Sequence, residues 1–208
     1  MPMRIIDISS YQALTEATKA YIREADAVII KVTQGTSYVN PYWKQQLSYA
    51  VSNGKLTGLY HYAAGGSATA EANFFVSTIG PFGRNCLLFI DWESGSNRSW
   101  GSTTWALRFS NIVYALTNKR AHPYVAASSI GQVANMASNH VLWIAGYPVN
   151  ANSWTVPHFP YSVSPWKSYA LWQFTSNGID RSTSNLTAAQ WVALATNNET
   201  SSAATSRT

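Results

Sequence analysis

Apolar runs alternate along the chain with segments in which apolar residues recur every three to four positions. The runs predict β-strands and the periodic segments predict helices. We expect strands at residues 3–9, 27–33, 56–63, 86–93, 122–127, 141–146 and 169–175. Strand and helix in alternation imply right-handed crossovers and a mostly parallel sheet. Seven such strands favour an α/β barrel or a strongly curved sheet, and the irregular, proline-rich stretch 147–167 argues against a regular eightfold barrel.

The clearest helical pattern follows Asn40. Asn40 suits the N-cap, Pro41 the first helical position, and Gly54 the stop. Its apolar face would comprise Trp43, Leu47 and Val51. Further helices are expected at residues 67–79, 103–118, 129–138 and 187–195, the last opened by a capping box.

Most of the 208 residues fit one domain, because this length is enough for a single sizeable core. We expect that domain to cover residues 1–196. Residues 197–208 contain no apolar side chain larger than alanine, so they predict a flexible tail or linker.

Charged residues make up only 11% of the chain, well below the roughly 25% of an average soluble domain. The net charge of +5 arises from 14 Lys and Arg against 9 Asp and Glu, with no basic run. This distribution argues against a nucleic-acid partner. It is compatible with attraction to an anionic polymer such as a bacterial cell wall.

Several classes of site lack their signals in this sequence. The lone cysteine, Cys86, excludes an intrachain disulfide and is expected to be a buried structural thiol. The histidines show no metal-ligand spacing, and no glycine loop suited to phosphate is present, so we expect neither a metal nor a cofactor.

Signals for targeting and assembly are also missing from the sequence. Residues 1–7 lack the features of a signal peptide, and no apolar window reaches transmembrane length. We therefore expect no signal peptide and no membrane partner. Without heptads or another assembly signal, we expect a monomer.

The apolar run 87–90 ends in two carboxylates, Asp91 and Glu93. Residues i and i+2 of a strand point the same way, with Cα atoms roughly 7 Å apart. Crowding and aromatic burial would raise the pKa of one carboxyl and leave its neighbour ionised. Glycoside hydrolysis requires that division of labour. The alternative is a solvated strand end, which the apolar run disfavours.

Other polar and aromatic residues gather near the predicted strand ends, where ligands bind in parallel α/β folds. Taken singly, several have structural explanations: His61 as a core histidine, Lys31 as a partner of Asp7, and Asp180 as a turn former. The candidates are Asp7, Gln12, Lys31, Tyr60, His61, Tyr62, Tyr124, Trp143, Trp172 and Asp180.

Six motifs together resemble the family 25 glycoside hydrolases, which are lysozymes (N-acetylmuramidases), many of them bacteriophage endolysins. The resemblance covers nearly the whole chain up to Asn197. The motifs occur in the family's order: Asp7-Ile8-Ser9-Ser10-Tyr11-Gln12, Ile30-Lys31-Val32-Thr33-Gln34-Gly35, Gly58-Leu59-Tyr60-His61-Tyr62, Ile90-Asp91-Trp92-Glu93, Leu142-Trp143-Ile144-Ala145 and Leu171-Trp172-Gln173-Phe174.

The resemblance implies an irregular, flattened TIM-like β/α barrel with fewer than eight helices. It implies cleavage of the β-1,4 bond between N-acetylmuramic acid and N-acetylglucosamine in peptidoglycan, with retention of configuration. Glu93 would be the general acid, Asp91 its partner carboxylate, and Asp7 and Asp180 the family's other two acidic positions in the groove. All four are predicted as catalytic residues. The resemblance implies that Gln12, Tyr62, Tyr124 and Trp143 line the groove. Together with the strand-end candidates Lys31, Tyr60, His61 and Trp172, they are the predicted substrate-binding residues.

Two positions depart from the family pattern, and two other functions stay open. Many members have Glu where Gln34 stands, and the residues after Asp180 differ from the usual Asp-Leu-Asn. A catalytically silent wall-binding module and a chitinase-like hydrolase are the alternatives. A phage endolysin would be made in the host cytoplasm and then released to the wall.

Overall fold

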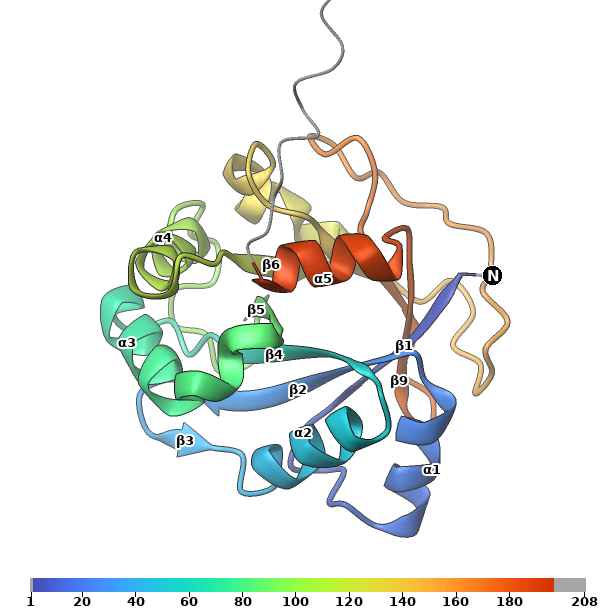
Figure 1. Cartoon of the computed structure of the whole chain (residues 1–208). Helices are drawn as coiled ribbons and strands as arrows, with labels where there is room; N and C mark the ends of the chain where they lie inside the picture. The colour runs from blue at the N-terminus through green and yellow to red at the C-terminus, as the bar shows by residue number, and fades with distance from the viewer. Residues whose placement is uncertain (1, 197–208) are drawn as a thin grey trace, which may run out of the picture.

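The computed structural model describes residues 2–196, and the predicted tail at 197–208 lies outside the described residues (Figure 1). The strands are β1 (Met3–Ile8), β2 (Ala27–Gln34), β3 (Tyr38–Val39), β4 (Leu56–Tyr62), β5 (Leu87–Trp92), β6 (Ala121–Ala126), β7 (Trp143–Ala145), β8 (Leu171–Thr175) and β9 (Asp180–Ser184). The α-helices are α1 (Glu16–Glu24), α2 (Trp43–Ser52), α3 (Ala68–Ile79), α4 (Trp105–Thr117) and α5 (Ala188–Thr196). Two 3₁₀ helices, η1 (Gly80–Asn85) and η2 (Ala127–Met136), complete the set within residues 2–196.

Eight of the described strands form a closed barrel. Their order is β1-β9-β8-β7-β6-β5-β4-β2, and pairing of β1 with β2 closes the circle. All neighbours are parallel except at β9, which runs antiparallel between β8 and β1. The expected mostly parallel, irregular TIM-like barrel is therefore confirmed. Strand β3 lies outside the barrel on β2.

All seven predicted strands are present, but the sequence pattern did not predict β3 or β9. Strand β9 reads Asp-Arg-Ser-Thr-Ser and has no apolar residue. It is a strand because it fills the gap between β8 and β1, where its backbone groups find partners on both sides. Long-range pairing of this kind leaves no periodic signal in the sequence.

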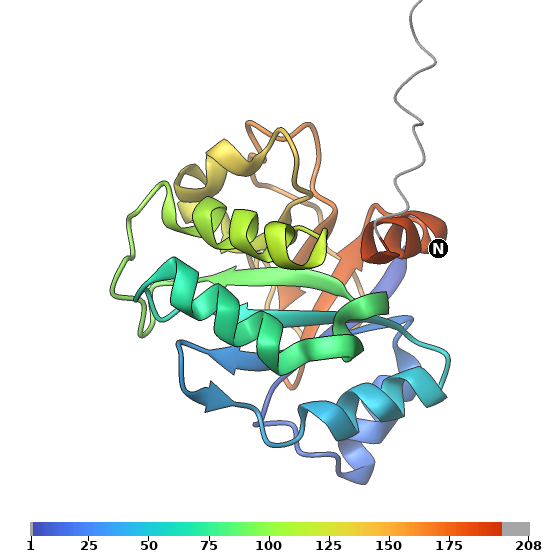
Figure 2. The ribbon, with the colours of Figure 1, turned by 60° about the vertical axis from the view of Figure 1, so that its left-hand side comes forward.

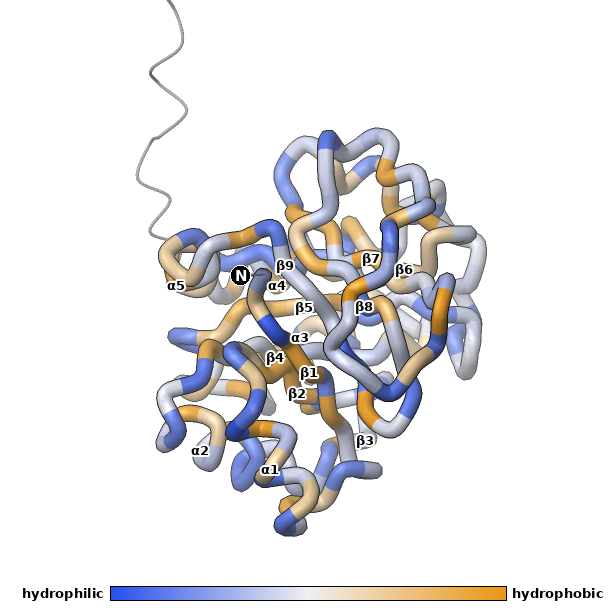
Figure 3. The backbone as a smooth tube through the Cα atoms, turned by 90° about the vertical axis from the view of Figure 1, so that its right-hand side faces the viewer, coloured by the Kyte–Doolittle hydropathy of each residue, from blue (hydrophilic) through white to orange (hydrophobic). Residues whose placement is uncertain are grey.

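Alternation along each strand divides the apolar residues between two cores. One lies inside the barrel and includes Ile29, Phe89 and Leu171. The other lies between the barrel and its helices and includes Ile30, Leu88 and Phe174. Figure 3 shows the hydrophobic stretches of β1, β2 and β4 at the centre of the molecule. Two-sided burial explains why these strands are apolar at nearly every position.

The helices cover the outside of the barrel, with α3 and α4 packed side by side (Figure 2). Two details of the predicted helix near residue 40 were wrong. The helix begins at Trp43, and the buried Asn40 side chain accepts a hydrogen bond from Tyr42 N at 2.9 Å and donates to Lys31 O at 2.8 Å. Val51 is 58% exposed and lies off the apolar face. The segment near residues 129–138 is a 3₁₀ helix, η2.

Helix α5 packs against β4 and β5, near the strand ends opposite the acidic residues. Its buried Trp191 donates a hydrogen bond to Thr57 O at 3.2 Å. Cys86 is buried, as predicted, and has a free thiol. Within residues 2–196, the helices are too short or too polar to cross a membrane.

Candidate active site

The inward-facing side chains at the carboxyl ends of the barrel strands form a pocket. Asp7 comes from β1, Asp180 from β9, and Asp91 and Glu93 from β5 and its end. Strands β4, β6 and β7 contribute Tyr60, Tyr124 and Trp143 in the same way, whereas Tyr147 comes from the segment after β7. The lining comprises Asp7, Tyr60, Asp91, Glu93, Tyr124, Trp143, Tyr147, Gln173 and Asp180.

Asp7 and Asp180 face each other across the pairing of β1 with β9, where they are register partners. Asp7 Oδ2 accepts a hydrogen bond from Gln173 Nε2 at 2.8 Å. Burial, followed by the charge of Asp180, raises the pKa of Asp7 well above its ordinary value. Burial and the charge of Glu93 raise the pKa of Asp180 to about 6. Asp180 is therefore a pocket residue on a strand rather than a turn former.

Asp91 and Glu93 share one face of β5 and its extension, as the sequence predicted. Burial, and then the charge of Glu93, raises the pKa of Asp91 well above its ordinary value. Burial also raises the pKa of Glu93, although Lys31 and Tyr124 act in the opposite direction. Asp91 Oδ1 is buried and has no hydrogen-bond partner among residues 2–196. An acceptor left without a donor is costly, so this oxygen is available to a ligand.

Lys31 is the cation that acts on the β5 carboxylates, and its charge lowers the pKa of both. Its ammonium donates to Gln34 Oε1 at 2.8 Å and lies 4.4 Å from the ring centroid of Tyr62. Among the described residues 2–196, Lys31 forms no ion pair with Asp7, the structural role that its sequence position had also allowed.

The aromatic candidates from β4, β6 and β7 meet inside the barrel. Tyr124 and Trp143 pack edge to face with their ring centroids 4.5 Å apart. The Trp143 indole donates to Ser182 Oγ at 3.1 Å, which fixes the ring in place. Tyr60 lines the same pocket, whereas Tyr62 is not part of the lining and its ring lies beside the Lys31 ammonium.

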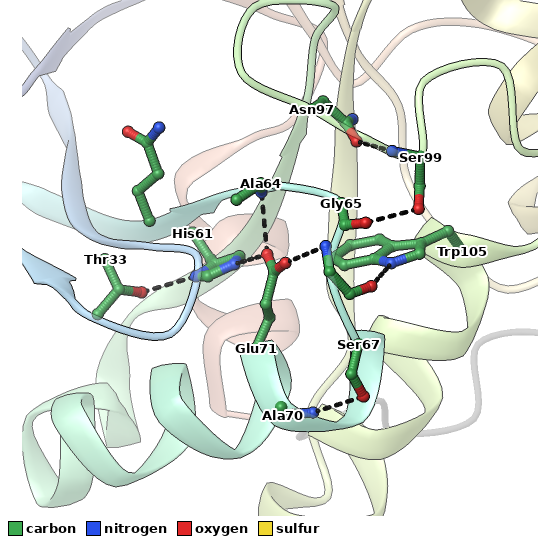
Figure 4. A network of polar contacts seen from close by, with 12 residues as sticks. Thr33, His61, Ala64, Gly65, Ser67, Ala70, Glu71, Asn97, Ser99 and Trp105 are labelled. Carbon is green, nitrogen blue, oxygen red and sulfur yellow. Dashed lines mark hydrogen bonds and ion pairs between the residues drawn. The ribbon is translucent and has the colours of Figure 1, made fainter.

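Five predicted site residues are not among those that line the pocket. Two of them, Lys31 and Tyr62, contact each other, and the charge of Lys31 acts on the pocket carboxylates. The other three are engaged elsewhere. His61 is fully buried between β4 and α3, where Thr33 and Glu71 contact its two ring nitrogens (Figure 4). Trp172 faces outward into an aromatic cluster and donates to Gly146 O at 2.9 Å. Gln12 folds back onto its own loop, where its Oε1 accepts from Ser9 N at 2.9 Å.

Two residues that line the pocket, Gln173 and Tyr147, were not among the predicted site residues. Gln173 Oε1 accepts hydrogen bonds from the hydroxyls of Tyr124 and Tyr147, while its Nε2 donates to Asp7. Successive side chains of a strand point to opposite faces, a regularity that we call strand parity. Because Trp172 points outward, strand parity predicts that Gln173 points into the barrel. Tyr147 lies in the irregular segment after β7, where no periodicity could place it.

The pocket therefore combines four carboxylates, one nearby cation and a wall of tyrosine and tryptophan. Carboxylates with raised pKa values retain protons that can be donated near neutral pH. Within residues 2–196, no group of three or more His, Cys, Asp or Glu has an arrangement suited to a metal ion. The arrangement suits acid–base chemistry on a polar, uncharged bond such as a glycosidic bond.

Known proteins share this architecture. The chain is 36% identical over 128 residues to an N,O-diacetylmuramidase of Chalaropsis sp, covering 54% of this chain and 61% of that protein. It is 30% identical over 187 residues to a lysozyme of Streptococcus phage Cp-7, covering 85% of this chain and 51% of the phage protein. The chain thus spans about half to three fifths of these relatives.

A solved structure agrees over a longer span. The bacterial lysozyme from Streptomyces coelicolor superposes with a TM-score of 0.76 at 27% identity, covering 95% of this chain and 98% of that one. The family model described as glycosyl hydrolases family 25 matches residues 6–183, which include all four pocket carboxylates. With both the barrel and the sequence in agreement, this chain belongs to glycosyl hydrolase family 25.

Proposed function

We propose that this chain is a lysozyme that hydrolyses the β-1,4 bond between N-acetylmuramic acid and N-acetylglucosamine in bacterial peptidoglycan. The observation that carries the proposal is the pocket in which Asp7, Asp91, Glu93 and Asp180 converge at the carboxyl ends of the strands. Family membership and the muramidase and lysozyme names of the relatives support this choice of substrate.

Glu93 is the proposed general acid. It lines the pocket just beyond the end of β5 and is the less buried carboxyl of the pair, which favours its contact with a glycosidic oxygen, and burial raises its pKa. It would protonate the leaving sugar oxygen and then, as a carboxylate, take a proton from the attacking water. Because its charge also acts on Asp91, the two carboxyls titrate as a coupled pair.

Asp91 is the proposed partner of Glu93 in stabilising the positive charge that develops on the sugar. Its Oδ1 has no hydrogen-bond donor among the described residues, and we propose that the substrate supplies one. An acetamido N–H of the sugar is a donor of this kind, so the orphaned oxygen supports a role in orienting that group. Direct attack by Asp91 is the other route by which configuration would be retained.

The remaining pocket residues are proposed to bind the glycan. Asp7 and Asp180 offer acceptors for sugar hydroxyls, and the faces of Tyr60, Tyr124 and Trp143 offer apolar walls. Lys31 and Tyr62 would contact substrate at the edge of the pocket. For Gln12, His61 and Trp172 we propose indirect roles, because their side chains are engaged away from the pocket.

The proposed setting is the bacterial cell wall. Residues 1–196 would form the catalytic unit, acting as a monomer on peptidoglycan, and release from a host cytoplasm would precede action if the protein is a phage endolysin. The phage origin of one relative supports this setting.

Two substrates distinguish the proposal from its alternatives. The protein would be incubated with purified peptidoglycan and with chitin, and new reducing ends would be identified after borohydride reduction. The proposal predicts reduced muramic acid from peptidoglycan and slower release from chitin. Preferential cleavage of chitin would indicate a chitinase-like enzyme. Binding to peptidoglycan without any cleavage would indicate a wall-binding module.

A further inference from the structure

A buried carboxylate outside the pocket organises the loop between β4 and α3 (residues 63–67). Glu71, in the first turn of α3, is 1% exposed. Its Oε2 accepts from Ala64 N at 3.0 Å and its Oε1 accepts from Gly66 N at 2.7 Å. Figure 4 shows these bonds converging on the one side chain. A single ionised group therefore fixes two peptide units of this loop.

His61 provides the third partner of Glu71. Burial lowers the pKa of His61, so the ring is neutral, and the hydrogen bonds lower the pKa of Glu71 despite its burial. The neutral ring donates from Nε2 to Glu71 Oε2 at 2.9 Å and accepts at Nδ1 from Thr33 Oγ1 at 2.8 Å. The Glu71 carboxylate is thus fixed by His61 on β4 as well as by the backbone N–H groups of the 63–67 loop.

The carbonyl groups of the same loop hold the segment that follows Glu93. Ala64 O accepts from Arg98 N at 3.0 Å. Gly65 O accepts from Ser99 Oγ, and Gly66 O from Trp105 Nε1, both at 2.7 Å. The fit is close at Gly65, where an added Cβ would lie 2.2 Å from Ser99 N. Three successive carbonyls therefore anchor Arg98, Ser99 and the first residue of α4.

Trp105 connects the anchored loop to Asp91 and Glu93 through Trp92. Its ring stacks on Trp92, with centroids 5.4 Å apart, and Trp100 stacks on Trp92 as well, at 5.9 Å. Trp92 lies between Asp91 and Glu93 in the chain and faces outward, while both carboxylates face inward. Trp92 is fully buried and closely packed, so we infer that a displacement of its ring is transmitted to the adjacent peptide units, which carry both carboxylates.

We propose that Glu71 is a positioning residue for the Asp91–Glu93 pair, acting through the 63–67 loop, Trp105 and Trp92. This inference rests on the proposed function, because it assigns Glu71 to the same reaction. Catalytic groups misplaced by about 1 Å can lose a hundredfold in rate even when substrate still binds. We therefore expect the loss of Glu71 to lower kcat and to shift the pH profile, with little change in KM.

The test compares Glu71→Gln with Ser67→Ala on solubilised peptidoglycan. Ser67 caps the same helix by accepting from Ala70 N at 3.3 Å, so its loss weakens α3 without breaking the loop contacts. We expect Glu71→Gln to lower kcat about 10- to 100-fold with KM within about twofold. The alkaline limb of the pH profile should shift by about half a unit or more. Ser67→Ala should retain the kcat and pH profile of the parent when each protein is assayed at the same number of degrees below its own Tm.

Trp105→Phe keeps an aromatic ring at the stacking position but removes the donor to Gly66 O together with part of the indole volume. It should show part of the loss of kcat expected for Glu71→Gln. If Glu71→Gln does not fold, the kcat and pH profile of Trp105→Phe test the proposal instead. Parent-like kcat and pH profile in a folded Glu71→Gln, or in Trp105→Phe when Glu71→Gln is unfolded, would overturn the proposal. A parent protein that cleaves no peptidoglycan would instead overturn the proposed function.

Discussion

Gln173 Nε2 donates a hydrogen bond of 2.8 Å to Asp7 Oδ2, joining residues 166 positions apart. The bond crosses β9, which lies between β8 and β1 in the barrel. The same amide accepts from Tyr124 and Tyr147 through its oxygen. One buried side chain therefore orients an acid and two hydroxyls of the pocket.

Replacing Gln173 by Ala should therefore impair the pocket more than the fold. The bond from Gln173 lowers the pKa of Asp7, so its loss raises that pKa further and releases both tyrosine hydroxyls. We expect kcat/KM on peptidoglycan to fall about 10- to 100-fold. The exposed Asn185→Ala is the matched amide control and should retain activity. Equal activity of the two variants would contradict a role for Gln173 in orienting the pocket residues.

Lys31→Gln should move the pH–activity profile to higher pH. The ammonium lowers the pKa of both Asp91 and Glu93, so its removal raises both. The acid limb requires one carboxyl to ionise and the alkaline limb requires the other to stay protonated. Both limbs of kcat/KM should shift upward. Lys44→Gln, on the exposed face of α2, should leave the profile in place, and a Lys31 variant with the same profile contradicts the assignment.

Asp180→Asn should stabilise the protein at pH 7 but not at pH 4. The folded pKa of about 6 exceeds the ordinary value of 3.8, so the folded state binds the proton more tightly. Its contribution to stability is complete below pH 3.8 and is lost as pH rises through 6. We expect a gain of about 1 kcal/mol, or about 2–4 °C in Tm, at pH 7.

Thermal unfolding of parent and variant at the two pH values checks this difference. The comparison cancels the buried histidines, whose effect has the opposite sign. Burial lowers the pKa of His122 to about 3 and of His140 to about 4, so each destabilises the fold as pH falls below 6.5. An equal change in Tm at pH 4 and pH 7 would show that the Asp180 carboxyl does not titrate as described.

Trp172→Phe and Trp143→Phe should separate packing from substrate binding. Trp172 packs against Phe159 outside the barrel, so its truncation should lower Tm and leave kcat/KM within about twofold. Trp143 lines the pocket, so its truncation should lower kcat/KM about tenfold. Steady-state kinetics and thermal unfolding of both variants give the answer. Loss of activity in the Trp172 variant at unchanged Tm would place that ring in the binding site.

Most of the barrel was predictable because two-sided burial makes its parallel strands apolar throughout. The pairing of Asp91 with Glu93 followed from strand parity alone. The same parity separates His61 from Tyr60 and Tyr62, and Trp172 from Gln173, and it would have selected Gln173 over Trp172. Strand β9 left no pattern, because barrel closure rather than local periodicity makes it a strand. The positions of Tyr147 and Glu71 depend on loops that only the folded chain brings together.

The central claim is that Glu93 supplies the acid for cleavage of the muramic acid bond. Glu93→Gln keeps the shape of the side chain and removes the transferable proton, so turnover should fall at least about 10²- to 10⁴-fold. Parent and variant would be compared on purified cell walls by counting newly formed muramic acid reducing ends. A binding assay on the same walls serves as the control. The account predicts that the folded variant binds the walls but forms almost no such ends, whereas near-parental release would contradict it.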